Sequence, residues 1–252
     1  MAVATTRQTL SKEKTLPVAR RDKTSLDEMP LQHGKTGRSC AENSLNFANA
    51  LRLRAQGARK GERTKISLQV ATCEFLDAYP IRDLTVATIC KATGVAHGTM
   101  YVYFKDRNAI VADVLMGFVE FVQHSMRDVS YSGSTDVVRK VGSTYYDLFE
   151  QNKGLMRCLV SYREEFPEAI IAFQSLNSSW LKSVVASLRR RNRASHLDDD
   201  ELLRRAYALG GMVDQYLTAL LLNNDKTLAE VSPDREVVID TLTTLWNLGF
   251  EK

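Results

Sequence analysis

The sequence has few of the residue patterns that mark enzymes, metal centres and secreted proteins. Its 252 residues include only four cysteines, none in a CxxC spacing, and four scattered histidines. Zinc sites need closely spaced cysteine and histidine ligands, and disulfide-rich secreted domains need many cysteines. The glycine fingerprints of nucleotide-binding loops and the nucleophile motifs of hydrolases are also missing. The sequence therefore predicts no catalytic site, no metal site and no cofactor.

Long apolar runs are missing as well. The best candidate for a membrane span, residues 202–222, contains Arg204, Arg205 and Asp214, whereas a span needs about 20 apolar residues. No apolar run follows the early basic residues, so the N-terminus lacks the pattern of a secretory signal. We expect a soluble cytoplasmic protein with no membrane contact.

The residues that are present indicate an all-α fold. The composition is that of a globular protein, with 44% hydrophobic and 25% charged residues. Apolar residues recur at helical spacing from Arg63 onward, and no segment alternates as a strand would. The formal charge is unevenly placed, because residues 1–62 hold twelve Lys and Arg against six Asp and Glu.

This basic N-terminal segment, residues 1–62, is predicted to be a disordered extension. Residues 1–38 are rich in Thr, Ser, Lys and Arg and have almost no apolar periodicity. Residues 43–59 have a ragged apolar face that is compatible with a short helix. Two interpretations stay open, a basic arm for the DNA backbone or minor groove, and a solvated tail ahead of an alternative start at Met29.

The most informative stretch is residues 84–104, which read LTVATICKATGVAHGTMYVYF. Thr85 is suited to cap a helix that turns Val86, Ile89 and Cys90 inward, and Gly94 favours the left-handed backbone that ends a helix. A second short helix is predicted to begin near Ala96. This pattern of helix, tight turn and helix is typical of proteins that read the DNA major groove.

The second short helix has one apolar side and one side rich in hydrogen-bonding groups. The helical spacing buries Val95, Met100 and Phe104. The residues predicted to face the groove or lie at the leading end are His97, Gly98, Thr99, Tyr101 and Tyr103. These residues offer a ring nitrogen, hydroxyls and a close backbone approach, which suit base edges.

From Arg63 to about Leu115 the sequence resembles the TetR family of bacterial transcriptional repressors. The matching residues are Thr85, Val86, Ile89, Gly94, Val95, Gly98, Thr99, Tyr101, Tyr103, Phe104 and Ile110. The resemblance implies a three-helix DNA-binding domain at residues 63–123 and a helical regulatory and dimerisation domain at 124–252. It departs from the family at Ala96, where a capping serine is common, and at Asn108, where an acidic residue is usual.

The resemblance also implies a homodimeric repressor, associated with the nucleoid, that binds a pseudo-palindromic operator in double-stranded DNA. Base contacts are expected from the second helix, and phosphate contacts from the residues around its ends. The complete set of predicted DNA-binding residues is Thr85, His97, Gly98, Thr99, Tyr101, Tyr103, Lys105 and Arg107.

In the second domain, the apolar and aromatic residues suggest a cavity for a small, mostly apolar effector. The predicted lining residues are Phe118, Phe121, His124, Tyr145, Phe149, Met156, Tyr162, Phe173 and Trp180. Plain core packing explains the same pattern. A rival hypothesis is therefore a DNA-binding helical protein that is controlled by a protein partner and has no small-molecule inducer.

The last two long helices are predicted to pair across the two-fold axis of the dimer, as is usual in the family. The predicted interface residues form apolar stripes on these helices. They are Leu209, Val213, Leu217, Leu220, Val238, Leu242, Leu245 and Trp246.

Overall fold

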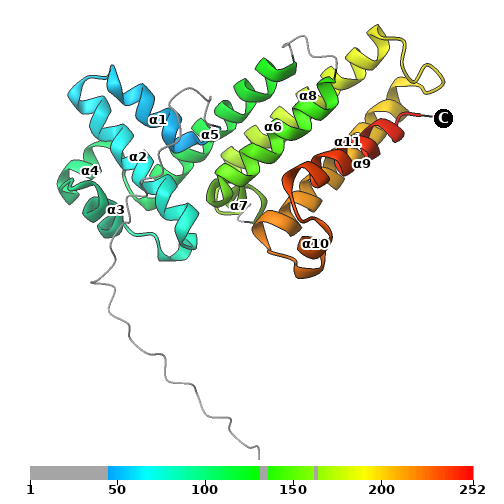
Figure 1. Cartoon of the computed structure of the whole chain (residues 1–252). Coiled ribbons are helices and arrows are strands. Elements are labelled where there is room, and N and C mark those ends of the chain that lie inside the picture. Colours follow the sequence, from blue (N-terminus) through cyan, green and yellow to red (C-terminus); the bar gives the residue numbers. More distant parts are fainter. Residues whose placement is uncertain (1–44, 131–135, 162–163, 252) are drawn as a thin grey trace, which may run out of the picture. The chain divides into compact units, whose positions relative to one another are not determined.

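The computed structural model describes residues 45–130, 136–161 and 164–251. In these ranges the chain forms helices and no strand, which confirms the all-α prediction (Figure 1). The first five helices are α1 (Phe47–Gln56), α2 (Lys60–Ala78), α3 (Val86–Thr93), α4 (His97–Tyr103) and α5 (Arg107–Ser130). The later helices are α6 (Val137–Gln151), α7 (Lys153–Ser161), α8 (Pro167–Arg190), α9 (Asp199–Leu217), α10 (Lys226–Val231) and α11 (Arg235–Leu248). A 3-10 turn (Ile81–Asp83) precedes α3, and a π-helical turn (Thr218–Leu222) follows α9.

The helix boundaries around the predicted DNA reader follow from local capping. Thr85 and Thr88 form a reciprocal capping box, with the Thr88 backbone N–H donating to Thr85 Oγ1 at 3.1 Å. Gly94 ends α3 with a φ of 68°, the left-handed conformation that favours glycine. Asp106 caps α5 by accepting a hydrogen bond from the Ala109 backbone N–H at 2.8 Å. The sequence predictions for Thr85 and Gly94 are confirmed.

The prediction that the disordered extension reaches residue 62 is wrong for residues 45–62. These residues form α1 and the start of α2, and Phe47, Ala48 and Leu51 are buried. The Phe47 ring lies 5.8 Å from the Phe118 ring and 5.5 Å from the Phe121 ring, both on α5. Helix α1 also packs against α2, but the ring partners of Phe47 lie about 70 residues away, so the local pattern gave only a ragged apolar face. Residues 1–44, which include Met29 and Cys40, lie outside the described ranges.

Helix α5 is the central helix of the core. By length and composition it is apolar enough to cross a membrane, unlike the stretch 202–222 that the sequence suggested as the best candidate. Its apolar side chains are instead enclosed by protein, and Ile110, Val114 and Phe118 are each 0% exposed. Helices α2, α6, α7 and α8 all pack against α5. The helix therefore has the burial of a core helix in a globular protein.

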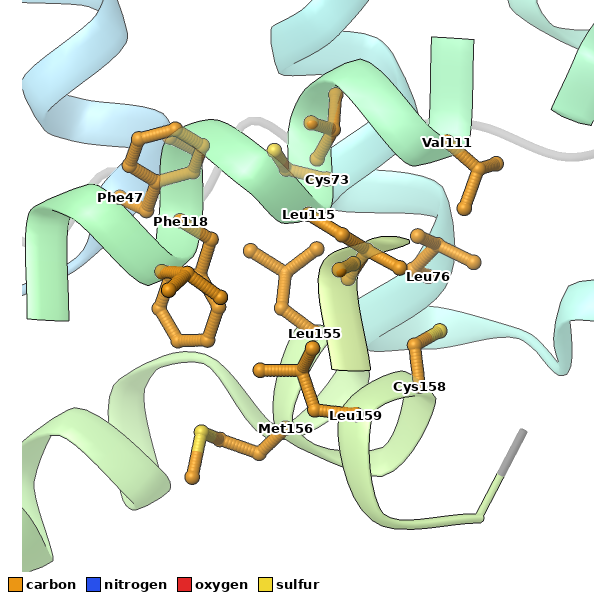
Figure 2. Close-up of a cluster of buried hydrophobic side chains, with 14 of the residues drawn as sticks. Phe47, Cys73, Leu76, Val111, Leu115, Phe118, Leu155, Met156, Cys158 and Leu159 are labelled. Carbon is orange, nitrogen blue, oxygen red and sulfur yellow. The ribbon is translucent and has the colours of Figure 1, made fainter. Parts of the chain in front are cut away.

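Helix α7 joins the N-terminal helices to the C-terminal ones. Figure 2 shows its side chains Leu155, Met156, Cys158 and Leu159 beside Cys73 and Leu76 of α2 and Leu115 and Phe118 of α5. Burial raises the pKa of the Cys158 thiol to about 12 and raises the pKa of Cys73 still further. Both thiols therefore stay protonated and pack as small apolar groups rather than as nucleophiles.

The chain makes a second, polar connection at the junction of α6 and α7. Asn152 is 1% exposed. Its Oδ1 accepts a hydrogen bond from the Phe47 backbone N–H at 2.7 Å, and its Nδ2 donates to Leu45 O at 2.7 Å and Leu148 O at 2.9 Å. One buried side chain thus ties the start of α1 to the end of α6.

Candidate nucleic-acid interface

Helices α3 and α4 form a compact helix-turn-helix that is stabilised from its inner side. Met100 and Phe104 are buried at 0% and 5% exposure, and Val95 is half-buried. The Cys90 Sγ lies 3.8 Å from Met100 Sδ, so α3 and α4 are in direct contact. This packing confirms the predicted inner side of α4 and fixes which residues remain on its outer side.

The outer side of α4 carries hydrogen-bonding groups with open space around them. His97, Gly98, Thr99 and Tyr101 are all exposed, and Tyr101 is 55% exposed. A Cβ added at Gly98 would meet no described atom within 4 Å. The N-cap residue Ala96 makes no side-chain cap bond, as its missing hydroxyl predicted. These four residues form the reading face, a name used below for His97, Gly98, Thr99 and Tyr101.

Tyr103, which the sequence also assigned to this face, has a different environment. It is half-buried, and its hydroxyl oxygen lies 3.4 Å from the position of a Cβ built on Gly61. Tyr103 therefore lies against the first turn of α2. This contact places the exposed side chains of Arg59, Lys60 and Arg63 near the end of α4, with Glu62 among them.

The residues predicted to contact phosphates also separate into two groups. Lys105 is exposed. Arg107 is half-buried, and its guanidinium donates to Ile81 O at 3.4 Å and to Asn108 Oδ1 at 3.1 Å. Thr85 is exposed, but its hydroxyl belongs to the capping box. Lys105 is thus the best placed of the three for a phosphate, and the basic residues at the start of α2 join it.

Sequence reasoning missed Val102, which is 77% exposed and lies on α4. The sequence analysis assigned Val102 to neither side of the helix. The signal that would have found it is helical spacing, because Val102 follows Gly98 by four residues and therefore shares its side of the helix.

Apart from His124, the predicted ligand residues in the described ranges lie in or against the main hydrophobic cluster. Phe118, Phe149 and Met156 are 0% exposed within the main hydrophobic cluster, and Phe121, Phe173 and Trp180 are partly buried against it. Tyr162 lies outside the described ranges.

The prediction that His124 faces the interior is wrong. Its side chain is exposed, and Nδ1 lies 2.7 Å from Glu120 O of the preceding turn. The buried stripe of α5 passes through Val122 and Met126. His124 lies between these positions on the other side of the helix, so its neighbours in sequence gave a false indication of burial.

A polar pair missed by sequence reasoning lies next to the predicted ligand residues. Tyr145 donates from its hydroxyl to Asp214 Oδ1 at 2.7 Å, and its ring meets Phe149 edge-on at 5.3 Å between centroids. Burial raises the pKa of Asp214 above 3.8, while the bond from Tyr145 opposes this rise. Burial likewise raises the pKa of Tyr145 well above 10.0. This pair is a hydrogen-bonding group within an otherwise apolar region.

Two surface hollows lie elsewhere. One of about 250 Å³ is lined by Val138, Leu188, Arg193, Ala194, His196, Trp246, Asn247, Phe250 and Glu251. The other lies on α9 and is lined by Asp200, Leu203, Arg204 and Tyr207. Neither hollow is lined by a residue that the sequence assigned to the ligand.

The predicted dimer residues also require correction. Leu217, Val238 and Leu242 are buried in the core of their own chain, at 0%, 1% and 5% exposure, so they cannot face a partner. Leu209, Val213, Leu220 and Trp246 are half-buried, and Leu245 is 41% exposed. The heptad-like pattern did not show which apolar side of each helix faces the chain's own core.

Several large apolar residues remain exposed on α9 and α11, and those on α11 lie along one side of the helix. Val237, Leu245 and Leu248 are 37%, 41% and 54% exposed, and Tyr207 on α9 is 44% exposed. Residues 237, 241, 245 and 248 recur every three or four positions and therefore follow one side of α11. Helices α9 and α11 contact each other. The name outer stripe is used below for Tyr207, Val237, Leu245 and Leu248.

Comparison with known proteins supports the helix-turn-helix assignment. Residues 70–114 match the model described as bacterial regulatory proteins of the tetR family. The chain is 21% identical to the HTH-type transcriptional regulator EthR of Mycobacterium tuberculosis over 214 residues, which cover 81% of this chain and 94% of EthR.

Solved structures with the same fold extend the likeness to the C-terminal helices. A putative TetR-family regulator from Syntrophomonas wolfei superposes with a TM-score of 0.59 at 12% identity, covering 76% of this chain and 97% of that chain. The transcriptional regulator FadR from Bacillus subtilis, in complex with stearoyl-CoA, superposes with a TM-score of 0.54 at 17% identity, covering 73% and 98%. Residues 70–114, from α2 into α5, thus match the DNA-binding region of the tetR family of bacterial regulatory proteins, and most of the chain is similar to the transcriptional regulator EthR.

Proposed function

We propose that the protein is a repressor that binds a pseudo-palindromic operator as a homodimer and leaves it when a mostly apolar ligand binds. The observation that carries the proposal is the reading face of α4. Its side chains are exposed, while Met100 and Phe104 pack the opposite side of the helix into the core. A short helix held in this way fits the major groove, which is wide enough to admit it.

The chemistry of the reading face suits base recognition. The His97 ring and the Thr99 and Tyr101 hydroxyls donate and accept hydrogen bonds, as base edges require. Lys105 and the basic residues Arg59, Lys60 and Arg63 supply positive charge beside it. We therefore assign base contacts to the reading face and phosphate contacts to this basic group.

The outer stripe supports assembly into a homodimer. Its four residues are large and apolar and remain exposed in the single chain, a condition that favours burial against a partner. Two copies would present two reading faces to half-sites about 34–36 Å apart or somewhat farther, following the turn of the duplex.

Two observations support an apolar ligand. The C-terminal helices surround an apolar region in which the pair Tyr145 and Asp214 supplies the polar group. A protein with the same fold, FadR from Bacillus subtilis, was solved with stearoyl-CoA, a long-chain acyl compound. Because α5 and α7 connect this region to α2, a ligand that moves either helix would also shift α4.

One observation favours a second candidate, a regulator controlled by a protein partner. Phe118, Phe149 and Met156, the central residues of the predicted cavity, are fully buried in the packed core. A ligand would have to open this core. A partner that binds the surface would not need to.

The DNA assignment is tested by selecting operators from a random double-stranded library and measuring binding by variants. His97→Ala and Tyr101→Ala should each lose about 1–3 kcal/mol of discrimination at one base position. Lys105→Ala should weaken all sequences and reduce the salt slope by about 1. Ile171→Ala, at an exposed position of α8 outside the DNA-binding helices, is the control. Unchanged specificity in both reading-face variants would contradict the assignment.

Assembly is tested by sedimentation at micromolar concentration. Leu245→Glu combined with Leu248→Glu should yield monomers with poor operator affinity. Val231→Glu, on the exposed α10, should leave the oligomeric state unchanged. A monomeric unmodified protein would contradict the homodimer.

The two modes of control are separated by adding stearoyl-CoA to the protein–operator complex. Release with the purified components supports ligand control, and Tyr145→Phe should weaken that release. If stearoyl-CoA and shorter acyl-CoA compounds all leave the complex intact, control by a protein partner becomes the preferred candidate.

A further inference from the structure

Among the described residues, Val102 is the most exposed large apolar side chain, at 77%, and it lies on the recognition helix. Single apolar residues on a surface are ordinary. Val102 differs because it shares its side of α4 with Gly98 and follows the exposed Tyr101. The recognition helix therefore presents an apolar group where the other side chains of the reading face are polar.

The fold gives no internal reason for a valine at this position. The inner side of α4 is supplied by Met100 and Phe104, and Val102 is absent from the residues that pack against the hydrophobic core. β-Branched residues are also weaker helix formers than Leu, Met or Ala. An interior role and a helix-forming role are thus both poor explanations for Val102.

The major groove offers one apolar group on its base edges, the 5-methyl of thymine. Valine matches it well, because its two methyls are held in a strongly preferred rotamer and lose little freedom on contact. A methyl group neither donates nor accepts a hydrogen bond, so the His97 ring nitrogens and the Thr99 and Tyr101 hydroxyls cannot replace this contact, and Val102 is the more exposed apolar group, at 77% against 55% for Tyr101. The basic residues beside α4, Arg59, Lys60 and Lys105, suit the phosphates that flank such a base.

We infer that Val102 reads a thymine in each operator half-site by packing its methyl groups against the thymine 5-methyl. The inference rests on the proposed function, because it assumes that α4 enters the major groove. It adds a specificity-determining residue and the base that this residue selects.

The test uses the full chain and operators selected by the unmodified protein. Each thymine in turn is replaced by deoxyuridine, which removes only the 5-methyl and keeps every Watson–Crick group. At one thymine in each half-site, this replacement should weaken operator binding about three- to fivefold, as expected for the loss of one buried methyl contact. In Val102→Ala the same replacement should have no effect, because the partner of the methyl is gone.

Val102→Thr provides a second variant of nearly the same shape; it keeps one of the two methyl groups, so it should retain part of the sensitivity at that thymine. Because Val102 is exposed, both variants should keep the helical circular dichroism of the unmodified protein. Ile171→Ala, at an exposed position of α8, is the control, and it should retain the sensitivity to deoxyuridine at every thymine.

The outcomes separate this inference from the proposed function. If the unmodified protein selects no sequence at all, the proposed function fails. If it selects an operator, but Val102→Ala keeps the unmodified sensitivity to deoxyuridine at every thymine, only the inference about Val102 fails. The inference is supported if the effects of Val102→Ala and of deoxyuridine on binding free energy are non-additive at one thymine and additive at the others.

Discussion

Glycine is the second residue of both α4 and α7. Gly98 lies on the outer side of α4, whereas Gly154 lies where α7 packs against α2. Glycine costs a helix about 0.5–1 kcal/mol relative to alanine. A Cβ at Gly154 on α7 would lie 2.2 Å from the backbone carbon of Leu76, whereas a Cβ at Gly98 would meet no described atom within 4 Å. Close packing inside the chain accounts for Gly154. An added Cβ at Gly98 has room within the described chain, so this backbone is open to the close approach of DNA that the proposed function assigns to it.

The largest effect is expected when Gly154 is replaced. Gly154→Ala should reduce the free energy of unfolding by about 3 kcal/mol, because the new methyl meets the backbone of α2, which cannot rotate away. Urea unfolding measures this. The matched control is Gly142→Ala in α6, where an added Cβ has no described neighbour within 4 Å. It should gain about 0.5–1 kcal/mol. Equal stability of the two variants would contradict the interpretation.

The next effect tests the polar connection beside Gly154. Asn152→Ala should cost about 2 kcal/mol, because it leaves the buried Phe47 N–H and Leu45 carbonyl without this partner. Asn49→Ala is a suitable control, since Asn49 is exposed and accepts a hydrogen bond from the exposed Arg52. A loss in Asn152→Ala no larger than in Asn49→Ala would show that α1 is held by its apolar contacts alone.

This comparison also explains what the sequence predicted. The helix-turn-helix was predictable because its determinants are neighbours in sequence. Thr85 caps over three residues, Gly94 ends the helix that Thr85 starts, and Met100 packs on Cys90 ten residues earlier. Short-range patterns carry such information directly.

The remainder depends on residues that are far apart in sequence. The partner of Phe47 N–H is 105 residues away at Asn152, and Gly154 N–H donates to Asp77, 77 residues away, at 2.8 Å. A local pattern cannot reveal such contacts, so α1 was assigned to the extension. The same limit explains the errors at Leu217, Val238 and Leu242. Periodicity showed that they face something apolar, but not whether that surface belongs to the same chain.

Replacement of Gly98 should have smaller effects, raising the stability of the fold and lowering the affinity for the operator. Gly98→Ala should stabilise the fold by about 0.5–1 kcal/mol, because alanine is the better helix former and has room. Operator binding should weaken roughly tenfold, or about 1.4 kcal/mol, if DNA approaches this backbone closely. Thermal unfolding and operator titration would be compared on the same preparation. A gain in stability with unchanged binding would remove the reason for assigning Gly98 to the reading face.

The smallest effect concerns pH and the C-terminal region. Burial raises the pKa of Asp214 above its ordinary value of 3.8, so the folded chain holds this proton more tightly than the unfolded chain. The stability contributed by the protonated form is therefore present below about pH 3.8. It is lost as the pH rises through the raised pKa, by at most about 1.4 kcal/mol for each pH unit.

Asp214→Asn should remove this contribution, so the difference in unfolding free energy between the variant and the unmodified protein should change with pH from about pH 4 upward. Tyr145→Phe should extend the change to higher pH, because the lost hydroxyl had favoured the charged carboxylate. Asp128→Asn, at an exposed position of α5, serves as the control. A pH-independent difference for Asp214→Asn would mean that the carboxylate is solvated in the folded protein. The Tyr145–Asp214 pair would then not be a buried polar group, and its proposed role in an apolar ligand site would be contradicted.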